Sequence, residues 1–163
     1  MPPHQYDTLV QHLRSAISEL ASLGLGENLA KGRVGEIFLA HHLGHTLVPG
    51  DKGADGVCTD GKRFEYKVSV DDQYNFNFGS AATDAREARV DTHFAHYTGA
   101  YCGLLRDGKL VKVVYCPVNS LVPHLKSHLE TVTGNTWQKN FTPIAKFAAV
   151  PGATWMLWQA DEP

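Results

Sequence analysis

The sequence predicts an α/β fold in which helices flank a β-sheet. Two Asp-Gly pairs, at 60–61 and 107–108, each lie between runs of strand-forming residues and indicate β-hairpins. Apolar residues at helical spacing near the N-terminus indicate an amphipathic helix. A length of 163 residues suits a single domain over 1–163 with a substantial core.

The composition is that of a soluble globular protein, with 43% hydrophobic and 20% charged residues. No apolar run approaches the length of a membrane span, and the N-terminus lacks the apolar stretch of a signal peptide. The cysteines, Cys58, Cys102 and Cys116, form no zinc or disulfide pattern, which predicts a reducing compartment, the cytoplasm. A net charge of −2 argues against a purely electrostatic nucleic-acid binder, but it is compatible with a nuclease that carries catalytic acids.

Two helices are predicted before the first strand. The first spans 7–23, with an apolar stripe of Leu9, Leu13, Ile17 and Leu20. This stripe packs either on the chain's own core or on a second subunit. The second spans 28–43 and contains two interior glycines, which imply a packing reason for their presence. Glu36 lies on its apolar face, either as a rim carboxylate or as a group associated with a metal ion.

The segment 45–70 carries the candidate chemistry. A short strand at 45–48 precedes two strands, 54–59 and 63–70, that form the first hairpin. Because strand side chains alternate, Glu65 and Lys67 share one face, whereas Tyr66 points to the other. The hairpin brings Asp55 beside Glu65, and two adjacent carboxylates repel each other unless a cation lies between them. Hard oxygen ligands suit Mg²⁺, so the segment predicts a metal-dependent site for cleaving phosphodiesters.

An alternation of aromatic and amide residues follows at 74–78. It indicates either a strand with a buried aromatic face and a solvated amide face, or a strand whose Asn75 and Asn77 project into a groove. In the second case the amides, with Tyr74 beside them, would contact DNA, since an Asn amide can bind adenine N6 and N7 together.

The second half of the chain is predicted to alternate helices and strands. A helix over 80–90 presents Arg86, either as a phosphate contact or as a solvated charge. His93 and His96 have only loose metal-ligand spacing with Asp91, which favours surface histidines. The remaining expected elements are a hairpin of 101–106 and 110–116, a helix over 119–132 with Pro123 in its first turn, and strands at 144–150 and 154–158.

The order Glu36, Asp55, Glu65 and Lys67 resembles the PD-(D/E)xK nuclease superfamily. The block from Val48-Pro49-Gly50 through Gly53, Asp55, Val57 and Gly61 to Glu65 and Lys67 is similar to the PvuII-like type II restriction endonucleases. A fainter likeness continues through the second hairpin, the helix after it and the segment 140–150. The likeness covers most of the chain, although only 48–67 is specific.

The resemblance implies a restriction-endonuclease-like core, in which a central mixed sheet is flanked by helices. It implies a homodimer that holds double-stranded DNA between its subunits, with the N-terminal segment 1–26 in the dimer contact. Mg²⁺, or Mn²⁺ in its place, would bind Asp55, Glu65 and the Tyr66 carbonyl. Lys67 would orient or activate the attacking water, and Glu36 would orient a water or a second metal ion. The related enzymes recognise bases with histidines where this chain has 74–78, so the target sequence is not implied.

Two other functions remain open at this point. One is a structure-selective nuclease such as a Holliday junction resolvase, which the run Lys31-Gly32-Arg33-Val34-Gly35-Glu36 also fits, although such enzymes usually carry more basic surface. The other is a DNA-binding module of the same fold without cleavage activity. The intact set of Asp55, Glu65 and Lys67 argues against that module.

Overall fold

The computed structural model describes residues 4–23, 32–49, 54–79, 83–133 and 137–159, with the side chains of 83–86 excepted. Its helices are α1 (Asp7–Ser22), α2 (Arg33–Leu43), α3 (Thr83–Phe94), α4 (Val118–Leu129) and α5 (Ile144–Ala148). Its strands are β1 (Thr46–Leu47), β2 (Gly56–Val57), β3 (Arg63–Ser69), β4 (Tyr74–Asn77), β5 (Gly99–Arg106), β6 (Lys109–Pro117), β7 (Gln138–Phe141) and β8 (Thr154–Trp158).

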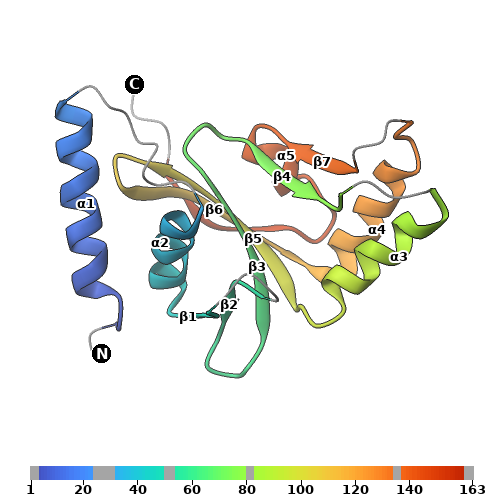
Figure 1. Cartoon of the computed structure of the whole chain (residues 1–163), viewed down its shortest axis with the longest axis horizontal. Coiled ribbons are helices and arrows are strands. Elements are labelled where there is room, and N and C mark those ends of the chain that lie inside the picture. The colour runs from blue at the N-terminus through green and yellow to red at the C-terminus, as the bar shows by residue number, and fades with distance from the viewer. Residues whose placement is uncertain (1–3, 24–31, 50–53, 80–82, 134–136, 160–163) are drawn as a thin grey trace.

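A six-stranded mixed sheet in the order β1-β2-β3-β5-β6-β8 forms the centre of the molecule (Figure 1). β3 and β5 are parallel, and the other neighbouring pairs are antiparallel. Strands β4 and β7 form a separate two-stranded antiparallel ribbon. The predicted α/β fold, with a central mixed sheet flanked by helices, is therefore confirmed.

Both predicted hairpins are present. β2 and β3 pair across the 58–62 turn, where Gly61 has φ +76°. β5 and β6 pair across Asp107 and Gly108, whose φ angles are 48° and 68°. Positive φ at both central residues is what a type I′ turn requires, which explains why the Asp-Gly pair was informative.

The two faces of the central sheet have separate cores. On one face, α2 packs on Phe64, Tyr66 and Tyr101, and α1 adds Val10 and Ile17 next to it. On the other face, α3, α4, α5 and the ribbon pack on alternate residues of β5 and β6, including Ala100 and Cys102. Figure 1 shows α1 and α2 at one end of the molecule and α3 and α4 at the other.

Several predicted elements need correction. α2 begins at Arg33, and Gly32 precedes it with φ +61°, so only Gly35 lies inside the helix. Residues 28–31 lie outside the described part of the chain. Pro123 is the sixth residue of α4 and therefore lies beyond its first turn. In α1 the buried residue near the N-terminus is Val10, whereas Leu9 is 42% exposed.

The largest errors concern the segment 138–150. The predicted strand at 144–150 is wrong, because Ile144–Ala148 forms α5, which begins directly after Pro143. Ile144 and Phe147, three residues apart, are buried on one side of this helix. β7, with the sequence QKNF, was not predicted because it contains few strand-forming residues. Its pairing with β4 holds it in extended form.

The three cysteines, Cys58, Cys102 and Cys116, are free thiols. Within the described ranges, no helix has the length and apolar character needed to cross a membrane.

Candidate active site

The first hairpin places Asp55 against β3. The backbone N–H of Asp55 donates to the Phe64 carbonyl at 3.0 Å, and the carboxylate Oδ2 accepts from the Tyr66 N–H at 2.7 Å. Asp55 thus extends the pairing of β2 with β3 by one residue. Its side chain accepts the hydrogen bond of the Tyr66 N–H, which a further residue of β2 would otherwise accept. The turn and the register of the hairpin together fix the position of this carboxylate.

Glu65 and Lys67 lie on the opposite face of β3 from Phe64 and Tyr66, as predicted. The Lys67 Nζ donates to Glu65 Oε1 at 2.6 Å, and the Glu65 side chain is 7% exposed. The Lys67 Nζ also lies 5.5 Å from the centroid of the Phe76 ring on β4. Glu65 and Lys67, which the alternation of strand side chains placed on one face, therefore form a largely buried ion pair beside the ribbon.

Helix α3 and the turn after it contribute two further residues that were not predicted for the site. The Nε2 of His93 lies 3.3 Å from Glu65 Oε2. Tyr97 lies close enough to Glu65 that burial and the Glu65 carboxylate together raise the pKa of the Tyr97 hydroxyl. The rings of His93 and Tyr97 stack with centroids 5.5 Å apart. The Glu65 carboxylate thus has partners from β3 on one side and from the α3 region on the other.

The parallel pairing of β3 with β5 explains this placement. Phe64 pairs with Gly99 and Glu65 with Ala100, so the residues that precede β5 necessarily lie near the start of β3. The sequence contained His93, but its spacing to Asp91 and His96 pointed to a surface location. Only the parallel pairing, which has no short-range sequence signature, identifies His93 as a site residue.

The environment of Asp55 disfavours its charged form. Burial raises the pKa of Asp55, the nearby charge of Glu65 raises it further, and the hydrogen bond from the Tyr66 N–H opposes both, with a resulting value of about 6. Near neutral pH this carboxylate is therefore ionised against the preference of its surroundings. A cation bound beside it would relieve that cost.

Glu65 and Lys67 stabilise each other's charges. Burial acts to raise the pKa of Glu65, but the hydrogen bond with His93 and the ion pair with Lys67 lower it to about 2. Burial acts to lower the pKa of Lys67, yet the ion pair with Glu65 raises it above its ordinary value. Without a metal ion Lys67 is thus a firmly held ammonium. The expected role of Lys67, to orient or activate the attacking water, stays a prediction.

The donors around Asp55 fit a hard divalent cation. In a β-strand the N–H and C=O of one residue point to the same side, so the Tyr66 carbonyl faces the same edge as the N–H that binds Asp55. Asp55, Glu65 and this carbonyl would supply the oxygen ligands that Mg²⁺ prefers. Within the described ranges no three His, Cys, Asp or Glu side chains form a metal cluster, and the set of Asp55, Glu65 and the Tyr66 carbonyl stays a prediction.

Glu36 has a partner of its own. Its Oε2 accepts a hydrogen bond from Arg33 at 2.7 Å, and Arg33 also donates to the Val48 carbonyl. The charge of Glu36 contributes to the raised pKa of Asp55, so it acts on the site electrostatically. Its side chain is 20% exposed, which fits a rim carboxylate paired with arginine. A role with water or a second metal ion stays a prediction.

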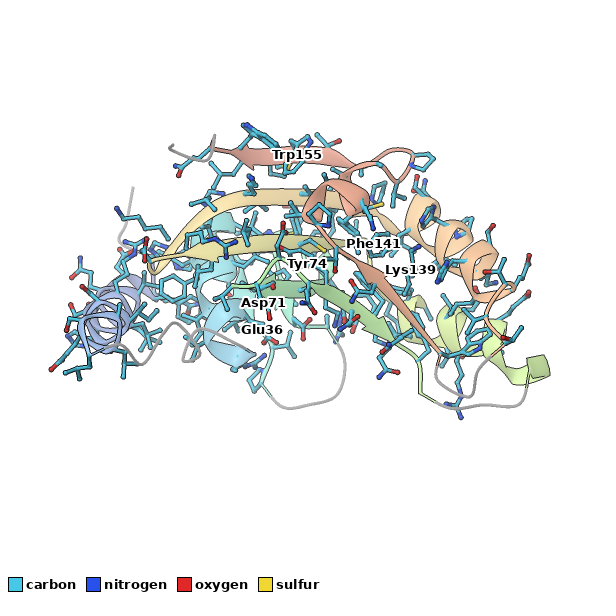
Figure 2. All side chains as sticks on the ribbon, turned by 90° about the horizontal axis from the view of Figure 1, so that it is seen from above. Glu36, Asp71, Tyr74, Lys139, Phe141 and Trp155 are labelled. Carbon is cyan, nitrogen blue, oxygen red and sulfur yellow. The ribbon has the colours of Figure 1, made fainter. Side chains whose placement is uncertain are left out.

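The predicted DNA contacts have different outcomes. Asn75 and Asn77 are exposed on β4, as predicted for a solvated amide face. Tyr74 is 1% exposed and lies opposite Phe141 in the core, so the prediction that it contacts DNA is wrong (Figure 2). Tyr74 and Phe76 are two residues apart on β4, so their side chains lie on the same, buried face. The Arg86 side chain lies outside the described part of the structure.

Comparison with models of protein families and with curated proteins finds no match for this chain.

Proposed function

We propose that this protein is a Mg²⁺-dependent endonuclease that hydrolyses phosphodiester bonds of double-stranded DNA at a specific sequence, in the manner of PvuII-like type II restriction endonucleases. The observation that carries the proposal is the arrangement on β3 and the adjoining hairpin. Asp55 is held against the Tyr66 N–H at 2.7 Å, and Lys67 is held on Glu65 at 2.6 Å. The carboxylates of Asp55 and Glu65 would bind a cation, and the Lys67 ammonium lies beside Glu65.

The chemistry of the substrate calls for these groups. A phosphodiester is anionic and repels hydroxide, so its hydrolysis requires positive charge at the phosphate and an activated water. Mg²⁺, or Mn²⁺ in its place, supplies both by neutralising charge and lowering the pKa of bound water. A site with a surplus of carboxylate charge and one ammonium is suited to hold such an ion.

The residues of the chain have separate roles in this proposal. Asp55 and Glu65 bind the cation together with the Tyr66 carbonyl, and Asp55 gains most because its charge is otherwise disfavoured. Lys67 places its ammonium where negative charge develops on the phosphate and the attacking water. His93 and Tyr97 hold the far side of the Glu65 carboxylate and keep it aimed at the site.

The proposed assembly is a homodimer in the cytoplasm, with double-stranded DNA between the subunits and the N-terminal helix at the dimer contact. Two copies of the site would then cut the two strands. Leu9 and Leu23, which are 42% and 66% exposed at α1, are apolar residues available for such a contact.

A cleavage assay tests the function. Purified protein is incubated with phage DNA and Mg²⁺ and compared with Lys67→Ala and with Lys109→Ala, a matched control at an exposed end of β6. Discrete fragments from the wild type and from Lys109→Ala, with a rate reduced roughly a hundredfold or more in Lys67→Ala, are expected. Cleavage of branched junctions alone would instead identify a resolvase. Binding without any cutting under Mg²⁺ and Mn²⁺ would contradict both enzymatic functions.

A further inference from the structure

The ribbon of β4 and β7 carries four carboxamides on one face. Asn75 lies opposite Asn140, and Asn77 lies opposite Gln138. Residues directly opposite each other in an antiparallel pair point to the same side, and all four of these are exposed. The alternate residues Tyr74, Phe76 and Phe141 are buried beneath the ribbon. Neither strand contains an acidic residue.

The four carboxamides differ in their hydrogen bonds. Asn77 Oδ1 accepts from the Gly79 N–H at 2.8 Å, and Asn140 Oδ1 accepts from the Thr142 hydroxyl. Within the described part of the chain, the carboxamides of Asn75 and Gln138 have no hydrogen-bond partner. Asn77 and Asn140, on one diagonal of the face, thus form hydrogen bonds at the ends of the ribbon. Asn75 and Gln138, on the other diagonal, present their donors and acceptors to solvent.

This face suits the major groove of DNA. A two-stranded ribbon fits that groove, and a carboxamide binds adenine by accepting from N6 and donating to N7. Diagonal cross-strand neighbours lie about 7–8 Å apart, which is roughly two steps of about 3.4 Å along B-DNA. The buried side of the ribbon contacts the site, because Phe76 lies 5.5 Å from the Lys67 Nζ. Bases recognised by the ribbon would therefore be a few base pairs from the cleaved phosphate.

Resting on the proposed function, we propose that Asn75 and Gln138 each recognise an adenine in the target site, and that methylation of adenine N6 blocks this recognition. In a base pair one N6 proton binds thymine, and the other points into the major groove. N6-methylation replaces the groove-facing proton with a methyl group, so the carboxamide oxygen loses its donor and meets a steric obstacle. Asn77 and Asn140 act as positioning residues for the ribbon. A methyltransferase acting on adenine N6 is then the class of enzyme that would protect the target.

The test uses binding, so that it does not depend on cleavage. The full-length Lys67→Ala protein, which is expected to cut DNA much more slowly, selects duplexes from a random library in the presence of Mg²⁺. The selected duplex is then remade with N6-methyladenine at each adenine, and affinities are measured by fluorescence anisotropy. Each methyl group at a recognised adenine is expected to weaken binding roughly 10- to 100-fold, the usual discrimination of a bidentate base contact.

Variants assign the two contacts. In the same background, Asn75→Ala should abolish the adenine preference and the methylation effect at one position, and Gln138→Ala at another. Asn119→Ala, at an exposed amide on α4 away from the ribbon, should change neither. Each variant is expected to fold, because both side chains are exposed and make no hydrogen bond to any described residue. Circular dichroism checks this.

The outcomes separate this inference from the proposed function. Selected sites without adenine, equal binding of methylated duplexes, or absence of any sequence preference would overturn the recognition by carboxamides. Cleavage of phage DNA by the wild-type protein would in those cases leave the endonuclease chemistry standing. Adenine-dependent binding by a protein that cuts no DNA would have the opposite meaning: the ribbon recognises bases, and the catalytic assignment is wrong.

Discussion

At the scale of single residues, Asp55 links the protein's stability to its chemistry. Its pKa of about 6 in the folded chain lies above the ordinary value of 3.8, so folding favours the protonated form. That contribution to stability is fully present below pH 3.8 and is lost as the pH rises through about 6. At pH 7.5 the metal-free protein thus carries a destabilising charge that a divalent ion can compensate.

We therefore expect Asp55→Asn to stabilise the metal-free protein. At pH 7.5 the gain should be about 1–2 kcal/mol, because raising the Asp55 pKa from 3.8 to about 6 corresponds to roughly 3 kcal/mol and the partial exposure of the side chain reduces it. At pH 4 the gain should be near zero. Urea unfolding at the two pH values measures the difference, with Asp60→Asn in the exposed hairpin turn as control. A loss of stability at pH 7.5 would contradict the assigned environment.

His93 gives a second prediction at this scale. Replacing it with Ala removes a donor from the largely buried Glu65 carboxylate, which should lower the free energy of unfolding by about 1 kcal/mol. His93→Gln, which keeps a nitrogen donor on a side chain of similar length, should recover part of that loss. His96→Ala, at an exposed neighbouring histidine, is the control. Equal stability of His93→Ala and His96→Ala in urea would show that the contact with Glu65 is dispensable.

At the scale of elements, turn residues predicted the two hairpins, and the period of two in a strand predicted which side chains of β3 share a face. The other features of the site depend on pairing between segments far apart in the sequence. Asp55, Glu65 and Lys67 were found because two of them share a strand face and a short turn brings the third alongside. His93 and Tyr97 were missed because the pairing of β3 with β5 joins segments more than thirty residues apart. β7 was missed because QKNF contains few strand-forming residues. α5 was missed although Ala and Lys in IAKFA favour a helix, because a short apolar run does not distinguish a strand from a buried helix.

The ribbon gives a prediction for the element that supports the site. Phe76 is 1% exposed and stacks on Phe147 with centroids 5.8 Å apart. Phe76→Ala should cost about 3–5 kcal/mol of unfolding free energy, the usual cost of emptying a buried phenylalanine site. Met156→Ala on β8, where the side chain is 51% exposed, should cost well under 1 kcal/mol. Similar losses in chemical denaturation would mean that the ribbon is not packed on this core.

At the scale of the whole molecule, the central sheet separates α1 from the proposed site. α1 buries Val10 and Ile17 against Phe38 and Leu105 and leaves its other face outward. In the proposed dimer this outward face contacts a second copy, whereas α3 and the ribbon remain available for DNA. In this proposal the end of the molecule with α1 forms the dimer contact, and the end with α3 and the ribbon binds DNA.

Negative charges introduced on the outward face of α1 test the proposed dimer contact. Leu9→Glu combined with Leu23→Glu should convert a dimer to a monomer, because two carboxylates would be buried at the contact. Met156→Glu, at a similarly exposed apolar residue on β8, should leave the dimer intact. Sedimentation equilibrium gives the mass of each protein. A wild-type monomer, or a dimer broken only by Met156→Glu, would show that α1 is not the contact.

In the proposed site Asp55 and Glu65 together hold a divalent cation, and Mn²⁺ titration followed by electron paramagnetic resonance measures this binding. The signal of free Mn²⁺ falls when the ion binds protein. We predict saturable binding to the wild-type protein, competition by Mg²⁺, and loss of binding in both Asp55→Asn and Glu65→Gln, with Asp60→Asn unchanged. Binding that is the same in Asp55→Asn, Glu65→Gln and the wild type would show that these two carboxylates do not hold the ion.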